Sequence, residues 1–304
     1  MHQKAIKFID KNINESFENK TIVITGGNSG IGKEVALQCA YLKMHIIIAV
    51  RSLERGSHAI EEIKVEYPNV NIELAELDLS NTESIRNFAN YIIDNNIDID
   101  YFYHNAGVYR LPYQLKEGRE LVVSTNYYGP YLLTSSLLDY LHQLPHPVKM
   151  IFTSSIAAKW AKDDISILLP KEKVSRKQRY ANSKLLDAYL FKYLFDNDKN
   201  NIHYFLVHPG VTNTSLFEKA YKSKLFVKTA NIFIKIFGNP LWKSALTTIY
   251  AVSNNGKEGA FYGPTHFFNV VGYPRRNKFL DKRYGNVQKI INKTEELSGQ
   301  KLLK

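Results

Sequence analysis

A glycine-rich turn near the start of the chain limits the fold more than any other feature. Gly26, Gly30 and Gly32 fall within TIVITGGNSGIGKEVALQCA, between an apolar run typical of a strand and a stretch typical of a helix. Glycine permits a tight turn and lets backbone N–H groups and a helix N-terminus approach a bound pyrophosphate closely. This order of strand, loop and helix predicts a nucleotide-binding site.

Strand-like and helix-like segments alternate over the first two thirds of the chain. Apolar runs rich in β-branched residues occupy residues 21–26, 45–50, 71–77, 99–105, 149–155 and 202–208. Such alternation is the pattern of a parallel sheet with right-handed crossovers and helices on both faces. We therefore predict an α/β fold, a single doubly wound Rossmann-like domain.

Nothing in the sequence divides the chain, because it holds no internal repeat, low-complexity tract or Pro/Gly-rich linker, so residues 1–304 are expected to form one domain. A short amphipathic extension precedes a core over residues 19–211. Residues 212–242 break the alternation, and we expect a mobile helical lid over an apolar substrate pocket. Residues 243–304 are expected to supply a C-terminal helix, a last strand and a tail. The lid aromatics are Phe217, Tyr221, Phe226, Phe233, Phe237 and Trp242.

Composition narrows the classes of function. Forty Lys and Arg against 29 Asp and Glu give a net charge of +11, but no nucleic-acid motif accompanies it, so a solvated basic surface is expected. The one cysteine, Cys39, cannot form an internal disulfide. The first twenty residues lack a signal-peptide core, and no apolar run reaches membrane-spanning length. We expect a cytoplasmic protein without a metal site that binds no nucleic acid.

Tyr180 and Lys184 lie four residues apart in RYANSKLLDAYL, so on a helix they share one face. A free phenol has a pKa of about 10 and is a poor base at neutral pH. An ammonium ~4 Å away, at an effective dielectric near 20, contributes about 4 kcal/mol, enough to lower a phenol pKa by roughly three units. The pair suits proton transfer to or from a carbonyl or alcohol oxygen.

These motifs resemble those of the short-chain dehydrogenases over roughly residues 19 to 215. The TGxxxGxG spacing, Asp78 in LDLS and HNAG at 104–107 match the family's cofactor positions, although His104 replaces an Asn of the family's NNAG turn. The resemblance implies cofactor contacts from Gly26, Asn28, Ser29, Gly30, Ile31, Gly32, Asp78, Leu79, Asn105, Ala106, Gly107, Tyr180, Lys184, Pro209, Gly210, Val211 and Thr214.

The same resemblance implies four catalytic residues. Tyr180 would be the general acid and base, and Lys184 would tune it and hold the nicotinamide ribose. Ser155 matches the family's substrate-stabilising hydroxyl. Ser154 stays an alternative, because one residue decides which face a strand side chain occupies. Asn126 would hold a water in a proton relay to the lysine, or simply bond backbone groups.

The end of the second predicted strand indicates which nicotinamide cofactor is bound. NAD-binding proteins of this fold usually place a carboxylate there, on the ribose hydroxyls. Here the residues are Ala49, Val50, Arg51 and Ser52. Arg51 can form charge-assisted hydrogen bonds with a 2′-phosphate, each worth about 1.5–3 kcal/mol, or about 10- to 100-fold in affinity. We expect NADP(H), with Arg51 and Ser52 near the phosphate.

Within the family, NSGIGKE, VRSLERG, HNAGV and YANSKL look similar to the retinol dehydrogenase and WW-domain oxidoreductase branch. This resemblance implies an NADP(H)-dependent oxidoreductase acting on an apolar carbonyl or alcohol. Two other functions stay open: a non-enzymatic NADP-binding sensor or scaffold, and a protein that binds nucleic acid or membrane surfaces through its charge. A small-molecule substrate is the expected partner. Peripheral membrane contact through the lid and a homo-oligomer are left open.

Overall fold

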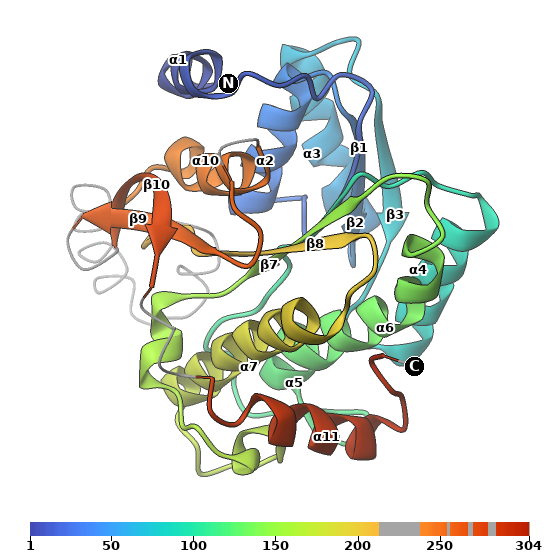
Figure 1. Ribbon diagram of the computed structural model, residues 1–304, viewed down its shortest axis with the longest axis vertical. Helices are drawn as coiled ribbons and strands as arrows, with labels where there is room; N and C mark the ends of the chain where they lie inside the picture. The colour runs from blue at the N-terminus through green and yellow to red at the C-terminus, as the bar shows by residue number, and fades with distance from the viewer. Residues whose placement is uncertain (213–237, 254–255, 267–269, 279–283, 304) are drawn as a thin grey trace.

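The computed structural model describes residues 1–212, 238–253, 256–266, 270–278 and 284–303. One eight-stranded sheet forms its centre (Figure 1). In chain order its strands are β1 Thr21–Thr25, β2 His45–Val50, β3 Ile72–Glu76, β4 Tyr101–His104, β7 Val148–Thr153, β8 Ile202–Val207, β9 Phe261–His266 and β10 Val271–Asn277.

The strand order is β10-β9-β8-β7-β4-β1-β2-β3, and all neighbours run parallel except the antiparallel pair β9 and β10. The chain moves outward from β1 to β3 and then returns to β4 on the other side of β1, so the strand order reverses there. The six predicted strands are all present, and the predicted doubly wound Rossmann-like fold is confirmed. Where one last strand was expected, the chain instead forms two, β9 and β10.

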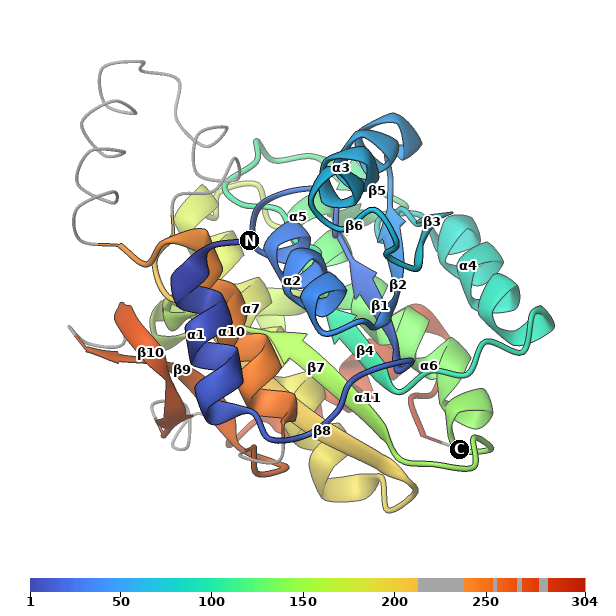
Figure 2. The same ribbon diagram turned by 90° about the horizontal axis from the view of Figure 1, so that it is seen from above.

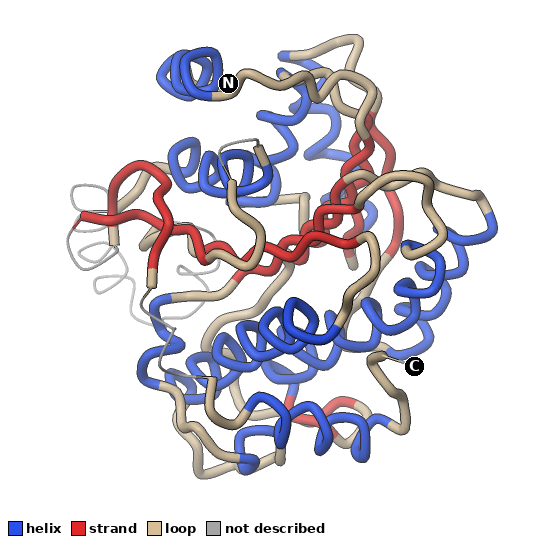
Figure 3. Tube along the Cα trace, viewed as in Figure 1, coloured by secondary structure: helices blue, strands red, loops and turns tan. Residues whose placement is uncertain are grey.

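Helices cover both faces of the sheet (Figures 2 and 3). One face carries α2 Gly30–Tyr41, α3 Leu53–Glu66 and α10 Leu241–Val252, with α1 Gln3–Asn12 outside α10. The other carries α4 Thr82–Asp94, α6 Gly129–Leu141 and α7 Arg176–Asn197, with α11 Val287–Ser298 outside α7. Each face has its own apolar core. Among the described residues, no helix combines the length and apolarity needed to cross a bilayer.

Several short elements lie between these helices and strands. They are the hairpin strands β5 Leu115–Lys116 and β6 Arg119–Glu120, the helix α5 Leu121–Val123, the π-helix η1 Ser124–Tyr128, and the 3-10 helices η2 Ile156–Trp160 and η3 Ile165–Leu168. The hairpin, α5 and η1 form one continuous segment, and η2 and η3 fill the segment between β7 and α7.

Side-chain caps fix where two of the helices begin. Asn81 Oδ1 accepts hydrogen bonds from the backbone N–H groups of residues 83 and 84 at 2.9 and 3.1 Å and starts α4. Ser175 Oγ accepts from the N–H of residue 178 at 3.2 Å and starts α7. Because α7 begins at Arg176, Tyr180 and Lys184 both fall in its first half.

The N-terminal extension forms α1, which buries Ala5 and Ile9 on its inner face. Trp242 was expected in the lid, and this prediction is wrong: the residue lies in the first turn of α10. Its ring stacks on His2, with 4.7 Å between the ring centroids, and so covers the junction of α1 and α10. The remaining lid residues, 213–237, lie outside the described residues.

A buried hydrogen bond ties the C-terminal helix to the interior. Tyr127 in η1 and Thr294 in α11 are fully buried, and their hydroxyl oxygens lie 2.7 Å apart. The Thr294 hydroxyl donates to the Ile290 carbonyl at 2.8 Å, so the Tyr127 hydroxyl is the donor in this pair. The helix α11 therefore holds the segment directly after Asn126.

Double-mutant analysis should detect this bond. Tyr127→Phe should lower the free energy of unfolding by about 1 kcal/mol. Thr294→Val should cost about 1–3 kcal/mol, because it leaves the Tyr127 hydroxyl buried without its acceptor. The double variant should cost clearly less than the sum, since the residues share one interaction. Urea unfolding of the four proteins measures the coupling, and strictly additive costs would contradict it.

Candidate active site

A cavity of about 910 Å³ opens at the carboxyl ends of β1, β2, β4, β7 and β8. Doubly wound sheets place their ligands at this edge, where the strand order reverses. Every predicted cofactor residue lines this cavity except Thr214, which lies outside the described residues. Ser155, Tyr180 and Lys184 line it too, whereas Asn126 lies behind the wall. The cavity residues that were predicted are Gly26, Asn28, Ser29, Gly30, Ile31, Gly32, Arg51, Ser52, Asp78, Leu79, Asn105, Ala106, Gly107, Ser155, Tyr180, Lys184, Pro209, Gly210 and Val211.

The glycine turn has the geometry that a pyrophosphate site needs. Gly26 and Gly30 have φ of +71° and +57°, in the left-handed region where side chains are strained. A Cβ on Gly32 would collide with the Asn105 side chain and the Gly26 carbonyl. The first turn of α2, with its unpaired backbone N–H groups, therefore lies at the cavity wall and fits a dinucleotide.

Asn105 links the ends of β1 and β4 beneath this turn. Thr25 Oγ1 accepts hydrogen bonds from the backbone N–H groups of Asn105 and Ala106, both at 3.0 Å. In return, Asn105 Nδ2 donates to the Thr25 carbonyl at 2.9 Å. The HNAG turn thus continues the sheet beyond its last backbone pairing.

The cavity end at β2 is cationic. Arg51 and Ser52 line it as predicted, and Arg55 joins them. Ser52 Oγ caps α3 by accepting from the Arg55 N–H at 3.4 Å, which places Arg55 in the first turn. Arg55 was not predicted, although its position four residues after Arg51 could have indicated it.

Asp78, the predicted adenine contact, already has partners within the chain. Its Oδ1 accepts from the Ser80 N–H and hydroxyl at 2.9 and 2.6 Å, and its Oδ2 pairs with Lys116 Nζ at 2.9 Å. Burial acts to raise the pKa of Asp78, but the Ser80 and Lys116 contacts outweigh it and lower that pKa. Lys116 comes from the β5–β6 hairpin and was not predicted.

At the opposite end, Gly210 and Val211 follow β8. Gly210 has φ of +88°, so the turn requires a glycine. The Val211 N–H donates to the Val270 carbonyl at 3.0 Å, and its carbonyl accepts from the Asn239 N–H at 2.8 Å. The predicted backbone contacts of Val211 with a carboxamide would therefore compete with bonds already made.

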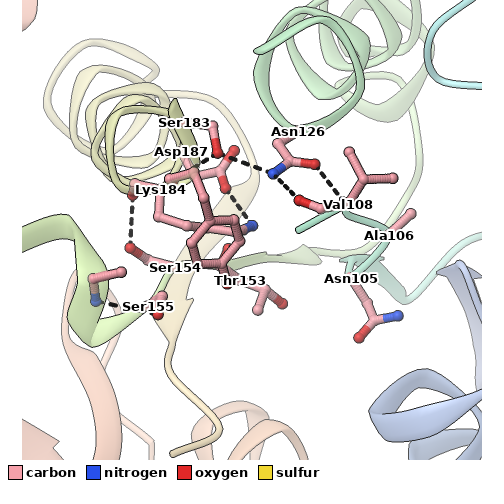
Figure 4. A network of polar contacts seen from close by, with 12 residues as sticks. Asn105, Ala106, Val108, Asn126, Thr153, Ser154, Ser155, Ser183, Lys184 and Asp187 are labelled. Atoms are coloured by element: carbon pink, nitrogen blue, oxygen red, sulfur yellow. Dashed lines mark hydrogen bonds and ion pairs between the residues drawn. The ribbon is translucent and has the colours of Figure 1, made fainter. Parts of the chain in front are cut away.

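Lys184 is held by two acceptors inside the protein (Figure 4). Its Nζ donates to the Thr153 carbonyl at 3.0 Å and to Asp187 Oδ2 at 2.7 Å. Burial acts to lower the pKa of Lys184, but the Asp187 charge outweighs it, and the pKa is raised. The lysine is thus an ammonium at neutral pH. Asp187 was not singled out from the sequence.

The two serines after β7 have different partners. Ser154 is buried, and its hydroxyl donates to the Lys184 carbonyl at 2.7 Å. Ser155 Oγ accepts from the Ala157 N–H at 3.2 Å, which uses an oxygen lone pair and not the hydroxyl proton. The Ser155 proton can therefore reach a ligand in the cavity, whereas the Ser154 proton is engaged by α7.

Asn126 clamps the segment that follows β4. Its Oδ1 accepts from the Val108 N–H at 2.7 Å, while its Nδ2 donates to the Val108 carbonyl at 3.0 Å and to Ser183 Oγ at 2.9 Å (Figure 4). The side chain is thus fully engaged. Pro130 lies four residues after Asn126 and has no N–H. The Asn126 backbone carbonyl therefore lacks the hydrogen-bond donor that an α-helix would normally supply.

A second buried ion pair lies beside the cavity and was not predicted. Arg179 Nε and Glu120 Oε1 are 3.0 Å apart, and both residues are about 5% exposed or less. Arg179 also donates to the carbonyls of Leu111 and Val174. These contacts tie Arg179, the residue directly before Tyr180, to the segments that carry Leu111 and Val174.

His104, which departs from the family's turn, lies in the core and not in the cavity. Its ring stacks on Phe152, with 4.7 Å between ring centroids, and its Nε2 lies 3.1 Å from Thr134 Oγ1. Burial lowers the pKa of His104 to about 3. The ring therefore stays neutral in the folded protein, while an unfolded chain takes up a proton below about pH 6.5.

This difference predicts a pH-dependent stability. The contribution of the neutral His104 ring to the free energy of unfolding is fully present above about pH 6.5 and is lost as the pH falls toward 3. Relative to His104→Gln, which cannot titrate, the wild-type protein should lose about 1 kcal/mol of unfolding free energy between pH 6.5 and 5.5. Urea unfolding at both pH values measures this, and a constant difference between the two proteins would contradict it.

The parallel sheet, the glycine turn and the Ser155, Tyr180 and Lys184 cluster together define an oxidoreductase built on a dinucleotide-binding domain. A family profile described as short chain dehydrogenase matches residues 20–224. The chain belongs to the short-chain dehydrogenase family.

Curated relatives include the retinol dehydrogenases. The chain is 32% identical over 224 residues to retinol dehydrogenase 12 from Homo sapiens, which covers 73% of this chain and 71% of that protein. It is 31% identical over 254 residues to short-chain dehydrogenase TIC 32 B, chloroplastic, from Brassica napus, covering 79% and 77%. The predicted likeness to the retinol dehydrogenase branch is confirmed.

Solved structures share the fold at lower identity. An uncharacterised protein from Mycobacterium paratuberculosis aligns with a TM-score of 0.73 and 24% identity, covering 96% of this chain and 97% of that one. A short chain dehydrogenase from Shigella flexneri, solved with NADP, aligns with a TM-score of 0.56 and 23% identity, covering 69% and 85%. At these identities the likeness shows the fold alone.

Proposed function

We propose that the protein is an NADP(H)-dependent oxidoreductase that interconverts an apolar aldehyde or ketone with its alcohol. One observation carries the proposal: the glycine turn and the side chains of Ser155, Tyr180 and Lys184 line the same cavity. The retinol dehydrogenases among the relatives support an apolar substrate. Arg51 and Arg55, without a carboxylate at the end of β2, support NADP(H).

The proposed mechanism divides the work among four residues. The bound cofactor would supply a hydride for reduction or accept one in oxidation. Tyr180 gives a proton to the carbonyl oxygen, and Ser155 donates a hydrogen bond to the same oxygen as charge develops there. Lys184 keeps a positive charge beside them. A relay water would be held by the backbone carbonyl of Asn126, because its side chain is engaged by Val108 and Ser183.

Part of the cavity lining is apolar, which suits such a substrate. The Tyr109 ring meets the Tyr180 ring edge-on, with 4.6 Å between centroids. Other apolar side chains in this wall are Leu111, Leu121, Ile156, Ala157 and Trp160. The segment between β7 and α7 thus forms part of the pocket. Such a surface favours a hydrocarbon substrate over a polar one.

We also propose that the protein works in the cytoplasm on a small molecule. The buried free thiol of Cys39 fits a reducing compartment. Peripheral membrane contact through lid residues 213–237 and self-association stay hypotheses. The alternative, an NADP-binding sensor or scaffold without turnover, would bind NADPH but leave its absorbance unchanged with every carbonyl compound.

Tyr180→Phe tests the proton donor. The variant should lose at least 100-fold in kcat, because the hydroxyl that protonates the substrate is gone, while its affinity for NADPH should change little. Tyr193→Phe, on the same helix but outside the cavity lining, is the matched control and should keep wild-type turnover. Steady-state rates with a long-chain aldehyde measure both, and more than a few per cent residual activity in Tyr180→Phe would place the donor elsewhere.

Arg51→Ala and Arg55→Ala test the choice of cofactor. Each should weaken NADPH binding about 10-fold or more and leave NADH binding nearly unchanged, since only NADPH carries the 2′-phosphate. Arg86→Ala, at an exposed position of α4 that does not line the cavity, is the control. Calorimetric titration of the two cofactors reports the effect. Equal affinities of the wild-type protein for NADPH and NADH would reject the proposed preference.

A further inference from the structure

Asp187 forms a buried ion pair with the lysine of the cavity. Its Oδ2 atom lies 2.7 Å from Lys184 Nζ, and the two side chains are only 5% and 6% exposed. The ammonium also donates to the Thr153 carbonyl from β7. Figure 4 shows the Lys184–Asp187 contact, with Thr153 nearby. The position of Nζ is thus set by a charge on α7 and a carbonyl on the sheet.

The packing of α7 does not itself require a charge here. The neighbouring residues 185, 186, 188 and 189 are all buried and apolar or aromatic. A buried carboxylate is unfavourable unless it is paired, and burial raises the pKa of Asp187 to about 6. Asp187 is nevertheless ionised at neutral pH, and its partner is Lys184. The carboxylate therefore serves the lysine and not the fold around it.

In the part of the chain that the structure describes, three other titratable groups interact electrostatically with this pair. They are Tyr180 on α7, Tyr103 on β4 and Tyr127 in η1. All three are phenols. Of these five residues, Lys184 therefore carries the positive charge and Asp187 the negative charge. The electrostatic field at Tyr180 thus depends on the balance between these two charges.

We propose that Asp187 is a positioning residue of the reaction centre, which holds the Lys184 ammonium in place and offsets part of the positive charge that it presents to Tyr180. This inference rests on the proposed function. A lone ammonium promotes loss of a proton from a nearby hydroxyl, and a carboxylate in contact with it opposes that effect. The carboxylate consequently weakens the electrostatic effect of Lys184 on the Tyr180 hydroxyl.

The separation of Asp187 and Tyr180 along α7 sets the expected shift of the pH profile. Asp187 and Tyr180 are seven residues apart on one helix, or roughly 10 Å along its axis. Removing one charge at that distance, at an effective dielectric near 20, moves a titration midpoint by about one pH unit. Loss of the Asp187 charge should move the pH profile of the reaction toward acid by that amount.

Asp187→Asn is the test variant, because asparagine has nearly the same shape and its amide oxygen can still accept from Lys184. In alcohol oxidation with NADP⁺, the pH at half-maximal kcat should fall by about one unit. In carbonyl reduction with NADPH, the pH at which activity falls on the alkaline side should be about one unit lower than in the wild-type protein. Asp187→Glu keeps the charge and should return both profiles toward those of the wild-type protein.

Asp196→Asn is the matched control on the same helix. It breaks an exposed ion pair with Lys192, more than two turns along α7 from Lys184, and should leave both pH profiles unchanged. Circular dichroism and thermal unfolding establish that each variant is folded. An Asp187→Asn protein that is folded and active with an unchanged profile would overturn the inference.

A second measurement needs no turnover. The rate at which acetic anhydride acetylates Lys184 in the cofactor-free protein, followed by peptide mass spectrometry across pH, reports the free-amine fraction. Its midpoint should fall by at least one pH unit in Asp187→Asn and stay constant in Asp196→Asn. An unshifted midpoint also overturns the inference. If the midpoint shifts but the wild-type protein reduces no carbonyl compound, the proposed function fails while the electrostatic pairing stands.

Discussion

The tie between Thr25 and Asn105 is the constraint on which the cavity depends. It lies between β1 and β4, where the strand order reverses and the chain leaves the sheet toward α2 on one side and the HNAG turn on the other. Backbone pairing between the two strands ends at Ile24 and Tyr103, so side-chain bonds must hold the strand ends together beyond it. Because Gly32 packs directly on Asn105, the same contact sets the position of the glycine turn.

On the other side of the cavity, buried ion pairs along α7 hold the residues around Tyr180. Arg179 pairs with Glu120, and Lys184 pairs with Asp187, on the two sides of the proposed donor Tyr180 in sequence. Unpaired, each of these groups would be strongly destabilising in the interior. The Arg179–Glu120 pair joins α7 to the end of β6, whereas the Lys184–Asp187 pair lies within α7 and holds the ammonium that bonds to β7. Arg179 donates to the Leu111 carbonyl in the loop after β4, and Lys184 donates to the Thr153 carbonyl at the end of β7. The helix thus keeps a fixed position between the substrate side and the cofactor side.

The sequence predicts the parts of this structure that depend on local pattern. Strand periodicity and the glycine turn identify the sheet and the cofactor end, because backbone conformation limits the residues allowed there. Partners distant in sequence could not be predicted in this way. Lys116 reaches Asp78 from a hairpin that has no strong strand signal, and Trp242 stacks on His2 because α1 returns to α10. Asp187 lies within RYANSKLLDAYL, but a charged residue in a helix is usually solvated, and only its burial reveals the ion pair.

The choice between the two serines shows why spacing alone was insufficient. Alternation of side chains holds only inside a strand, and β7 ends at Thr153. Ser154 still pairs with β8 through its N–H, while its hydroxyl bonds to the Lys184 carbonyl. Ser155 is already the cap of η2. Ser154 therefore fastens α7 to the sheet. In the proposed mechanism, this bond sets how far Tyr180 on α7 lies from Ser155, so that both can contact the same substrate oxygen. A structural hydroxyl beside a reactive one is required because neither can perform both tasks with a single proton.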